Sequence, residues 1–261
     1  MINELHIYKL IGRSLPQVHH ASGVVNRIIK PIYNRKKRGF IISEVLGFKM
    51  ELNPTECVDG NLLFCPQLYD YVEMDFLDKN LTEGDTFLDV GSHIGFYSLA
   101  ASKKTNSILA IEASPHTYKR LKKNIQLNSL NIKTANYGVS DTSELLKLSL
   151  NSDNNSGGQT FINTKDSGIE IQCHSLKHIL SEHGISEVKI MKIDVEGFEY
   201  KIFKHFLENN EKSIYPKFII TEFLVNEVHK STGNQVELLE SYGYEQIMET
   251  HYNRILEFKN S

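Results

Sequence analysis

Residues 86–100 read TFLDVGSHIGFYSLA, and this stretch decides the fold. A run that suits a buried strand, 86–90, is followed by Gly91 and Gly95, which frame a tight turn into a helix. Doubly wound α/β sheets bind their ligands at such turns, at the carboxyl end of the first strand. The glycines are spaced GxxxG, whereas the dinucleotide fingerprint is GxGxxG and wraps a pyrophosphate. Asp89, just ahead of the glycines, suits the cationic end of a ligand that lacks phosphate, although a turn that only shapes the chain would also use these glycines.

Two later turns fit the same kind of ligand. The strand SILAIEA (107–113) ends near Glu112, where an acid can accept hydrogen bonds from both hydroxyls of a ribose. The turn GVSD (138–141) borders the base in this architecture, so Asp141 can accept from an exocyclic amine and Ser140 can donate to a ring nitrogen. The conjunction of Glu112 with the glycine turn argues against a merely exposed acid. For the GVSD segment, a simple turn stays open as the alternative.

S-adenosylmethionine (SAM) has the required chemistry, because it joins a cationic sulfonium to an amino-acid tail and an adenosine and carries no phosphate. SAM is therefore the predicted cofactor. Its candidate binding residues are Asp89, Gly91, Ser92, His93, Gly95, Glu112, Ala113, Ser140 and Asp141.

After Gly84 the chain alternates short apolar runs with helical stretches. Further strands are expected at 132–136, 188–193, 217–222, 244–248 and 254–258, and helices at 117–128, 199–207 and 234–241. Near-continuous apolar strands separated by helices predict an α/β fold with a doubly wound, mostly parallel sheet covered on both faces. The last two strands have no helix between them, which predicts an antiparallel hairpin at one edge. We expect this domain to span residues 81–261, after an extension of residues 1–80 that holds a basic helical segment and short strands.

The basic segment of the extension runs from Arg13 to Arg38, where all seven charged side chains are positive. Apolar residues recur there at helical spacing, which indicates a short amphipathic helix containing Val24, Val25, Ile28, Ile29 and Ile32. One hypothesis is that the segment docks an anionic acceptor or makes peripheral contact with an anionic membrane. The alternative is a solvated helix face.

Composition excludes several other classes of function. The formal net charge of -3 gives no global basic field, so no nucleic-acid partner is expected. The three cysteines show neither a CxxC pair nor a Cys/His metal spacing, which speaks against a disulfide framework or a zinc site. The start of the chain lacks a secretory pattern, and no apolar stretch reaches the roughly 20 residues that span a bilayer. These features predict a cytoplasmic protein.

Acidic residues follow the strand expected at 188–193, in the string KIDVEGFE (192–199). Asp194 projects at the carboxyl end of that strand, and Glu196 follows two residues later. Transfer of a methyl group to a hydroxyl needs a positioned base or a metal ion, because a hydroxyl is a poor nucleophile. The candidate catalytic residues are Asp194, Glu196, Glu222 and His93. A divalent cation held by two of the carboxylates is compatible with this set, although no spacing requires it; Glu199 is interpreted as a helix N-terminal residue.

These strings together resemble the FkbM family of SAM-dependent methyltransferases. The resemblance covers roughly residues 69 to 223 and includes FLDVGSHIGFYSLA, ILAIEASPHTYKRLKKNIQLNSL and, most specifically, KIDVEGFE. It implies a class I methyltransferase (Rossmann-like) fold and O-methylation, often of sugars or of hydroxyls on cell-surface and secreted products. The expected acceptor is therefore a hydroxyl of a sugar, a surface glycan or a small-molecule product.

Two positions depart from the family pattern, and other functions stay open. Family members usually carry Asn at the position of His93, and an Asp at the position of Lys177. The alternatives are a methyltransferase of RNA or protein, a protein that binds SAM without turnover, and an NAD-dependent oxidoreductase. The GxxxG spacing disfavours the last, and the basic segment lacks the interleaved aromatics expected for RNA.

Overall fold

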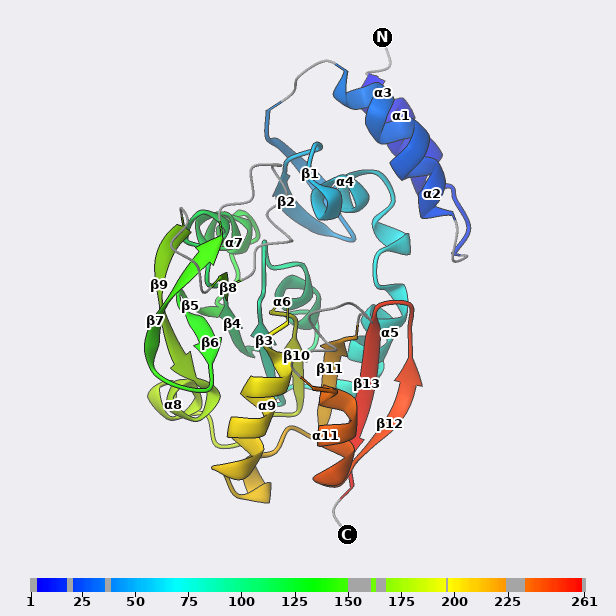
Figure 1. Cartoon of the computed structure of the whole chain (residues 1–261). Helices are drawn as coiled ribbons and strands as arrows, with labels where there is room; N and C mark the ends of the chain where they lie inside the picture. The colour runs from blue at the N-terminus through cyan, green and yellow to red at the C-terminus, as the bar shows by residue number, and fades with distance from the viewer. Residues whose placement is uncertain are drawn as a thin grey trace.

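The structure is a computed structural model that describes residues 4–17, 21–35, 39–149, 161–162, 168–195, 197–223 and 233–259. Its centre is a seven-stranded sheet with the order β12-β13-β11-β10-β3-β4-β5 (Figure 1). Neighbouring strands from β11 to β5 pair in parallel, and β13 and β12 continue the sheet antiparallel. The strands are β3 (Thr86–Val90), β4 (Ser107–Ile111), β5 (Lys133–Ala135), β10 (Ile190–Ile193), β11 (Phe218–Glu222), β12 (Tyr244–Glu249) and β13 (Asn253–Phe258). The predicted parallel sheet and its antiparallel edge hairpin are confirmed.

Both faces of this sheet are buried, which explains why its strands read as continuous apolar runs. In β3, Phe87 joins the hydrophobic cluster on one face, whereas Leu88 and Val90 join the cluster on the other. The first face is covered by α5 (Tyr71–Asn80), α6 (Phe96–Ala101) and α7 (Pro115–Leu127). The second is covered by α8 (Leu176–Glu182), α9 (Glu199–Glu208) and α11 (Gln235–Ser241). The short 3-10 helices are η2 (Pro66–Leu68) and η4 (Lys212–Ile214).

The insert between β5 and α8 folds as a separate small sheet with the order β6-β9-β7-β8. Its strands are β6 (Gly138–Ser140), β7 (Glu144–Ser149), β8 (Phe161–Ile162) and β9 (Gly168–Ser175). It lies beside the β5 end of the central sheet (Figure 1). The polar stretch NSDNNSGGQ (151–159), whose composition predicts a loop, lies outside the described residues.

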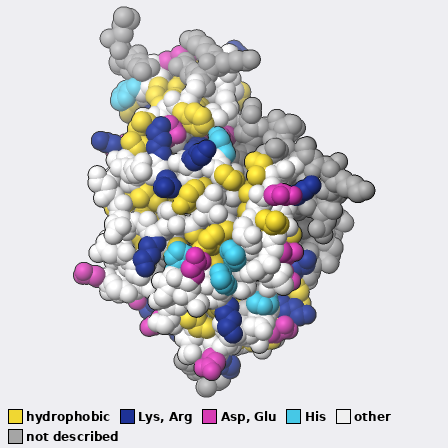
Figure 2. Space-filling model, turned by 90° about the vertical axis from the view of Figure 1, so that its left-hand side faces the viewer, with side chains coloured by type: hydrophobic (Ala, Val, Ile, Leu, Met, Phe, Trp, Pro, Cys, Tyr) yellow, Lys and Arg dark blue, Asp and Glu magenta, His cyan; other side chains and the backbone are white. Residues whose placement is uncertain are grey.

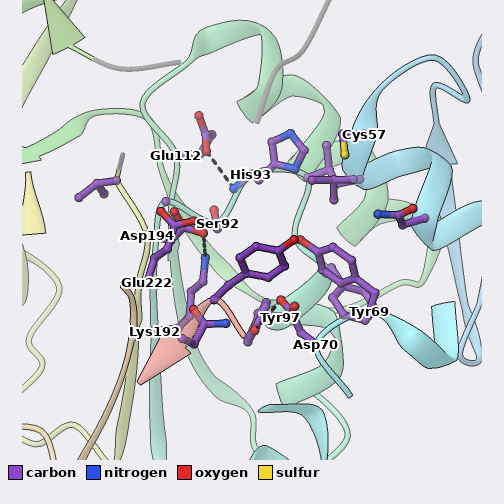
Figure 3. A pocket seen from close by; sticks show the side chains of 18 of the residues that line it. Cys57, Tyr69, Asp70, Ser92, His93, Tyr97, Glu112, Lys192, Asp194 and Glu222 are labelled. Atoms are coloured by element: carbon purple, nitrogen blue, oxygen red, sulfur yellow. Dashed lines mark hydrogen bonds and ion pairs between the residues drawn. The ribbon is translucent and has the colours of Figure 1, made fainter. Parts of the chain in front are cut away.

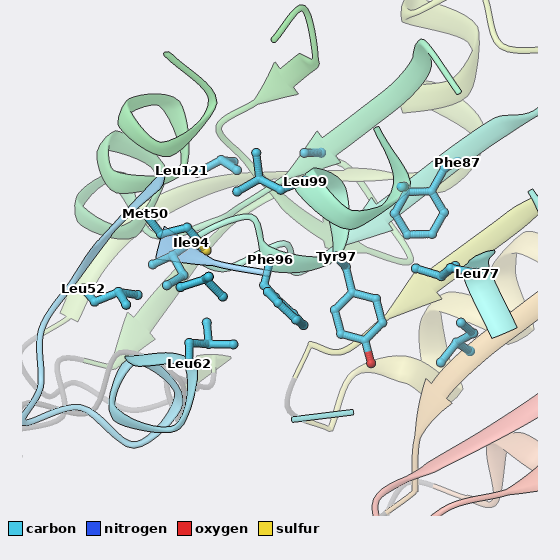
Figure 4. Packing of buried hydrophobic residues seen from close by; sticks show 14 of the residues in the cluster. Met50, Leu52, Leu62, Leu77, Phe87, Ile94, Phe96, Tyr97, Leu99 and Leu121 are labelled. Carbon is cyan, nitrogen blue, oxygen red and sulfur yellow. The ribbon is translucent and has the colours of Figure 1, made fainter. Parts of the chain in front are cut away.

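The extension precedes the central sheet and combines short helices with a two-stranded sheet. Its elements are α1 (Glu4–Arg13), α2 (Ser22–Val24), the π-helical turn η1 (Val25–Ile29), α3 (Lys30–Asn34), β1 (Ile41–Val45), β2 (Phe48–Leu52) and α4 (Cys57–Phe64). Figure 4 shows Met50 and Leu62 of the extension packed in one cluster with Ile94 and Leu121 from beyond residue 81. The extension therefore shares one hydrophobic core with the domain that follows it.

Buried ion pairs tie the extension to α7. Arg120 on α7 is 4 % exposed, and it pairs with Glu56 at 3.1 Å and with Asp59 at the start of α4. Burial raises the pKa of Asp59 to about 6, even though the guanidinium of Arg120 acts in the opposite direction. Because Glu56 and Asp59 both contact the guanidinium of Arg120, the contact fixes where the extension sits relative to the sheet.

Within the basic segment, residues 22–34 are helical, but their apolar side chains do not form one buried stripe. Val25 and Ile29 are buried together with Tyr33, whereas Val24, Ile28 and Ile32 are 38 to 53 % exposed. The buried residues are four apart in the sequence, and the first two lie within the π-helical turn η1. The aliphatic residue just before each of them is exposed to solvent. The basic residues Lys36, Lys37 and Arg38 lie outside the described residues. No helix in the described ranges has both the length and the apolar character needed to cross a membrane.

Candidate functional site

The carboxyl ends of β3, β4, β10 and β11 line a cavity of about 640 Å³. Gly91, Glu112, Asp194 and Glu222 reach it from these four strand ends. The opposite wall comes from the extension and contains Ser22, Asn26, Cys57, Asn61, Tyr69 and Asp70. A cavity of this size at the carboxyl edge of a parallel sheet is a usual place for a small-molecule ligand. Figure 3 shows side chains from both walls pointing into the same space.

The β3–α6 turn has the left-handed backbone that its sequence predicts. Gly91 and Gly95 have φ of +75° and +91°, and His93 between them also lies in this region at +50°. A side chain at Gly91 would approach the carbonyl oxygen of Asp194 to 1.9 Å, and one at Gly95 would meet Leu121 at 2.6 Å. Both glycines are therefore required by contacts within the protein, independently of any ligand. Gly91 and Ser92 line the cavity, and Gly95 begins the helix behind it.

Glu112 is held in place by the backbone at the end of β4. One carboxylate oxygen accepts from the N–H of His93 at 2.9 Å, and the other from the N–H of Ser114 at 2.8 Å. The side chain lines the cavity, and burial raises its pKa to about 7 despite these two hydrogen bonds. Each oxygen keeps a second lone pair, so the arrangement can accept hydrogen bonds from two adjacent hydroxyls. Ala113, the next residue, also lines the cavity.

Asp89 lies beneath the glycine turn instead of on the cavity wall. It has no exposed surface, and one of its oxygens accepts from the hydroxyl of Ser98 on α6 at 2.5 Å. Burial raises its pKa, opposed by the ammonium of Lys192. Its second oxygen has no hydrogen-bond partner among the described residues. A direct contact of Asp89 with the cofactor stays a prediction.

The segment after β5 lines the cavity with residues that precede the two predicted ones, Ser140 and Asp141, in the sequence. Tyr137, Gly138 and Val139 line it, whereas Ser140 and Asp141 are not among the lining residues. The hydroxyl of Ser140 is buried and donates to Asp141 at 3.0 Å and to Glu144 at 3.1 Å. Contacts of Ser140 and Asp141 with an adenine stay predictions, and the cavity wall at this point is made by the three preceding residues.

A buried lysine forms the centre of the site, and the sequence analysis assigned it no role. Lys192 on β10 is 7 % exposed, and its ammonium lies 3.0 Å from a carboxylate oxygen of Asp194 and over the ring of Tyr97 (Figure 3). Burial alone would lower its pKa, but Asp194 and Asp89 outweigh burial and raise it. Lys192 therefore stays charged and holds Asp194 at the cavity. The available signal was a lysine within the otherwise apolar strand Ile190–Ile193.

Two tyrosines and Asp70 extend this network toward the extension. The hydroxyl of Tyr97 donates to Asp70 at 2.8 Å, and Tyr69 lies beside them on the cavity wall. Asp70 has a left-handed backbone with φ of +45°, and burial raises its pKa to about 7. Tyr69 and Asp70 lie outside the motifs, because they precede the glycine turn and reach the site through packing of the extension on α6. Tyr97 stands within the glycine-turn motif, but its contact with Asp70 has no signal in the sequence.

The other candidate acids have different surroundings. Glu222 ends β11 and lines the cavity, and single carboxylate oxygens of Asp194, Glu199 and Glu222 lie within 4.8 Å of one another. Glu199 begins α9, as interpreted, and its two oxygens accept from the N–H groups of Val195 at 2.8 Å and Gly197 at 3.0 Å. Glu199 therefore shapes the loop after β10. Glu196, a candidate catalytic residue, lies outside the described residues.

His93 lines the cavity on the side of the extension. One of its ring nitrogens lies within 4.8 Å of carboxylate oxygens of Glu56 and Asp59. Burial lowers the pKa of His93 to about 4, and the nearby Arg120 acts in the same direction. A histidine with this pKa is neutral at physiological pH, and a role of His93 as the catalytic base stays a prediction.

A family model and several solved structures are similar to this chain. The methyltransferase FkbM domain matches residues 89–245, which is more than half of the chain. No curated protein matches the chain in sequence. Among solved structures, similarity extends to Trm5b of Pyrococcus abyssi, with 14% identity, 86% of this chain and 56% of that chain covered, and a TM-score of 0.46.

Two more solved structures are similar to this chain, with comparable sequence identities and TM-scores. One is a tRNA m1G37 methyltransferase of M. jannaschii, with 16% identity, coverage of 87% of this chain and 59% of that chain, and a TM-score of 0.47. The other is fibrillarin of Aeropyrum pernix, with 13% identity, coverage of 72% and 74%, and a TM-score of 0.44. This chain spans less than two thirds of the length of the first two structures.

The family match rests on the same segments that build the site. It begins at Asp89 on β3 and includes the glycine turn, Glu112 and the strand β10 with Lys192 and Asp194. The central sheet has the strand order and the antiparallel edge expected of the class I methyltransferase fold. This chain therefore belongs to the FkbM family of SAM-dependent methyltransferases.

Proposed function

We propose that this protein transfers the methyl group of SAM to a hydroxyl of a sugar, a surface glycan or a small-molecule product. The observation that carries the proposal is the Lys192–Asp194 pair, which faces the same cavity as the backbone-anchored Glu112. The pair offers a fixed carboxylate where an acceptor proton must leave, and Glu112 offers hydrogen-bond acceptors where a ribose would lie. One cavity thus contains the groups for both halves of the reaction.

The residues present fit SAM as the methyl donor. Glu112 would accept from the two ribose hydroxyls, and the segment from Tyr137 to Val139 would lie against the adenine. When bound, SAM supplies an electrophilic methyl group on a sulfonium, which leaves as the thioether S-adenosylhomocysteine. The acidic group of Asp89, beneath the glycine turn, favours a positively charged ligand in this part of the site.

Asp194 would act on the acceptor. Its carboxylate is about one third exposed, at 32 %, and so is accessible from the cavity. As the acceptor oxygen forms its bond to the methyl carbon, the hydroxyl proton would pass to Asp194. The ammonium of Lys192 would orient the carboxylate for this transfer, and Lys192 is thus a positioning residue.

The parts of the cavity wall formed by the extension and by the turn between β12 and β13 support a sugar-like acceptor. Tyr69 and Tyr252 offer amphipathic aromatic rings, and Asn26, Asn61 and Asn253 offer amide groups that can donate and accept hydrogen bonds. Rings and amides together suit a ligand with apolar faces and many hydroxyls. The formal net charge of -3 gives no field that would attract a polyanion such as RNA.

The test is transfer of a radioactive methyl group from SAM to defined acceptors. We expect label on a hydroxyl oxygen of a mono- or oligosaccharide, identified by mass spectrometry of the product, and no label in total tRNA. The matched control is Asp194→Asn, which should lose label from the same acceptor. Label in RNA or on a protein side chain, and none on any hydroxyl of a sugar or small molecule, would contradict the proposal.

A further inference from the structure

The outer face of the N-terminal helices carries an unusual number of exposed aliphatic side chains. It contains Ile7, Leu10 and Ile11 on α1 and Val24, Ile28 and Ile32 on α2, η1 and α3, with exposed fractions from 38 to 57 %. On α1 they follow helical spacing, three and four residues apart. Below, "the outer helical face" means these six residues. Single exposed aliphatics are common on protein surfaces, but six on two adjacent short helices are not.

Packing on the inner side fixes the direction of this face. The ring of Tyr8 on α1 contacts the ring of Tyr33 on α3 at 5.9 Å, and Val25, Ile29 and Tyr33 are buried. Gly12 lies so close to α4 that a side chain there would approach the carbonyl oxygen of Phe64 to 2.3 Å. The inner sides of the two helices thus pack against each other and against the neighbouring helix α4. Their other sides face away from these contacts. Figure 1 shows the two helices at one extremity of the molecule.

The N-terminal segment that contains this face has a net charge opposite in sign to the net charge of the remaining chain. Residues 1–43 contain eight Lys or Arg and one acid, for a net charge of +7. Because the whole chain carries -3, residues 44–261 carry -10. On the helices, Arg27 and Arg35 are exposed, next to Ile28 and one turn beyond Ile32. Figure 2 shows the side of the molecule that lies at the left in Figure 1, away from these helices, where basic and acidic side chains are both present.

We propose that the outer helical face docks the enzyme on an anionic lipid bilayer. Aliphatic side chains beside basic ones match the acyl and headgroup layers of such a surface, in the manner of an interfacial amphipathic helix. An anionic polymer in water would use the charges but not the aliphatics. A second copy of this chain would cover the aliphatics, but it would bring two basic segments together, and like charges repel.

Docking in this way places the cavity close to the bilayer. Ser22 on α2 and Asn26 on η1 line the cavity, and both lie on the same helical run as Val24 and Ile28. An acceptor attached to a lipid could thus approach the site from the docked face. The docking surface itself does not depend on which acceptor is methylated, so a failed acceptor assay leaves it intact.

The experiment measures binding of the purified chain to vesicles of phosphatidylcholine, with and without phosphatidylserine. We expect binding only with phosphatidylserine and weaker binding as salt is added. The double variants Leu10→Ser with Ile28→Ser, and Arg27→Gln with Arg35→Gln, should each weaken it by about tenfold or more. The matched controls are Leu145→Ser, an aliphatic side chain 64 % exposed on β7, and Lys133→Gln, a basic residue on the edge strand β5.

Each other outcome overturns the proposal. SAM affinity and the unfolding temperature establish that every variant is folded, since none of the substituted residues lines the cavity. The proposal is wrong if the folded wild-type chain does not bind the anionic vesicles, or if both double variants bind them as the wild type does. It is also wrong if light scattering shows a dimer that the Leu10→Ser, Ile28→Ser variant converts to a monomer, because the face is then occupied by a second copy.

Discussion

Asp194→Asn is expected to lower turnover by about 10²–10⁴-fold, the usual contribution of a positioned acid–base group, while SAM affinity stays within a few-fold. The amide is nearly the same size as the carboxylate, but it cannot take a proton from the acceptor. The carboxylate of Asp194 lies at the end of β10, on the ammonium of Lys192, and is accessible from the cavity. Cofactor contacts are assigned to Glu112 on a different strand, so the two effects should separate.

The measurement pairs calorimetric titration of SAM with rates of methyl transfer on one preparation of the variant. The control is Asp75→Asn, which removes an exposed carboxylate on α5 that pairs with Lys79. Loss of SAM binding in a folded Asp194→Asn protein would assign the residue to the cofactor site. Nearly normal turnover would show that the base lies elsewhere, and Glu222 and then His93 would be the next residues to change.

Glu112→Ala is expected to weaken SAM binding by about ten- to a hundredfold. Hydrogen bonds to a charged group contribute about 1.5–3 kcal/mol, and each 1.4 kcal/mol corresponds to a factor of ten in affinity. The variant removes both acceptors for the ribose hydroxyls. It also frees the N–H groups of His93 and Ser114, which now donate to this carboxylate. Unchanged SAM affinity in the folded variant would show that Glu112 does not bind the ribose.

The pH profile of SAM binding provides an independent control for Glu112. Its pKa is raised to about 7 by burial, so the side chain is ionised above that pH and gains a proton below it. The ionised form is the better acceptor, and SAM affinity should therefore fall as the pH is lowered from about 8 to about 6. Glu112→Gln should flatten that part of the profile. NAD should not bind the wild-type protein at either pH.

The elements that the sequence predicts best are those with a local signal. The strand at 86–90, the left-handed glycine turn and the helices after β4 and β10 all follow from apolar runs, glycines and proline within a few residues of one another. The position of Glu112 at the end of β4 follows in the same way, because the carboxyl ends of parallel strands share one edge. For these elements the local pattern agrees with the final fold, so each could be predicted from its own stretch of sequence.

The parts that could not be predicted depend on contacts between distant segments. Tyr69 and Asp70 reach the cavity because the extension packs on α6 and α7, and Arg120 pairs with acids 61 and 64 residues earlier in the chain. No spacing in the sequence indicates such contacts. Lys192 is a different case: it stands in a quoted motif, but its role depends on burial beside Asp194, which the strand pattern alone does not reveal.

The most direct test is an experimental structure of the protein with bound S-adenosylhomocysteine. We predict that both ribose hydroxyls lie within hydrogen-bond distance of Glu112, and that the thioether sulfur faces the space between Asp194 and the wall formed by Tyr69 and Asp70. The account would be contradicted by a ligand bound in the opposite direction, with its adenosine against Asp194, or by a ligand outside the cavity that these residues line.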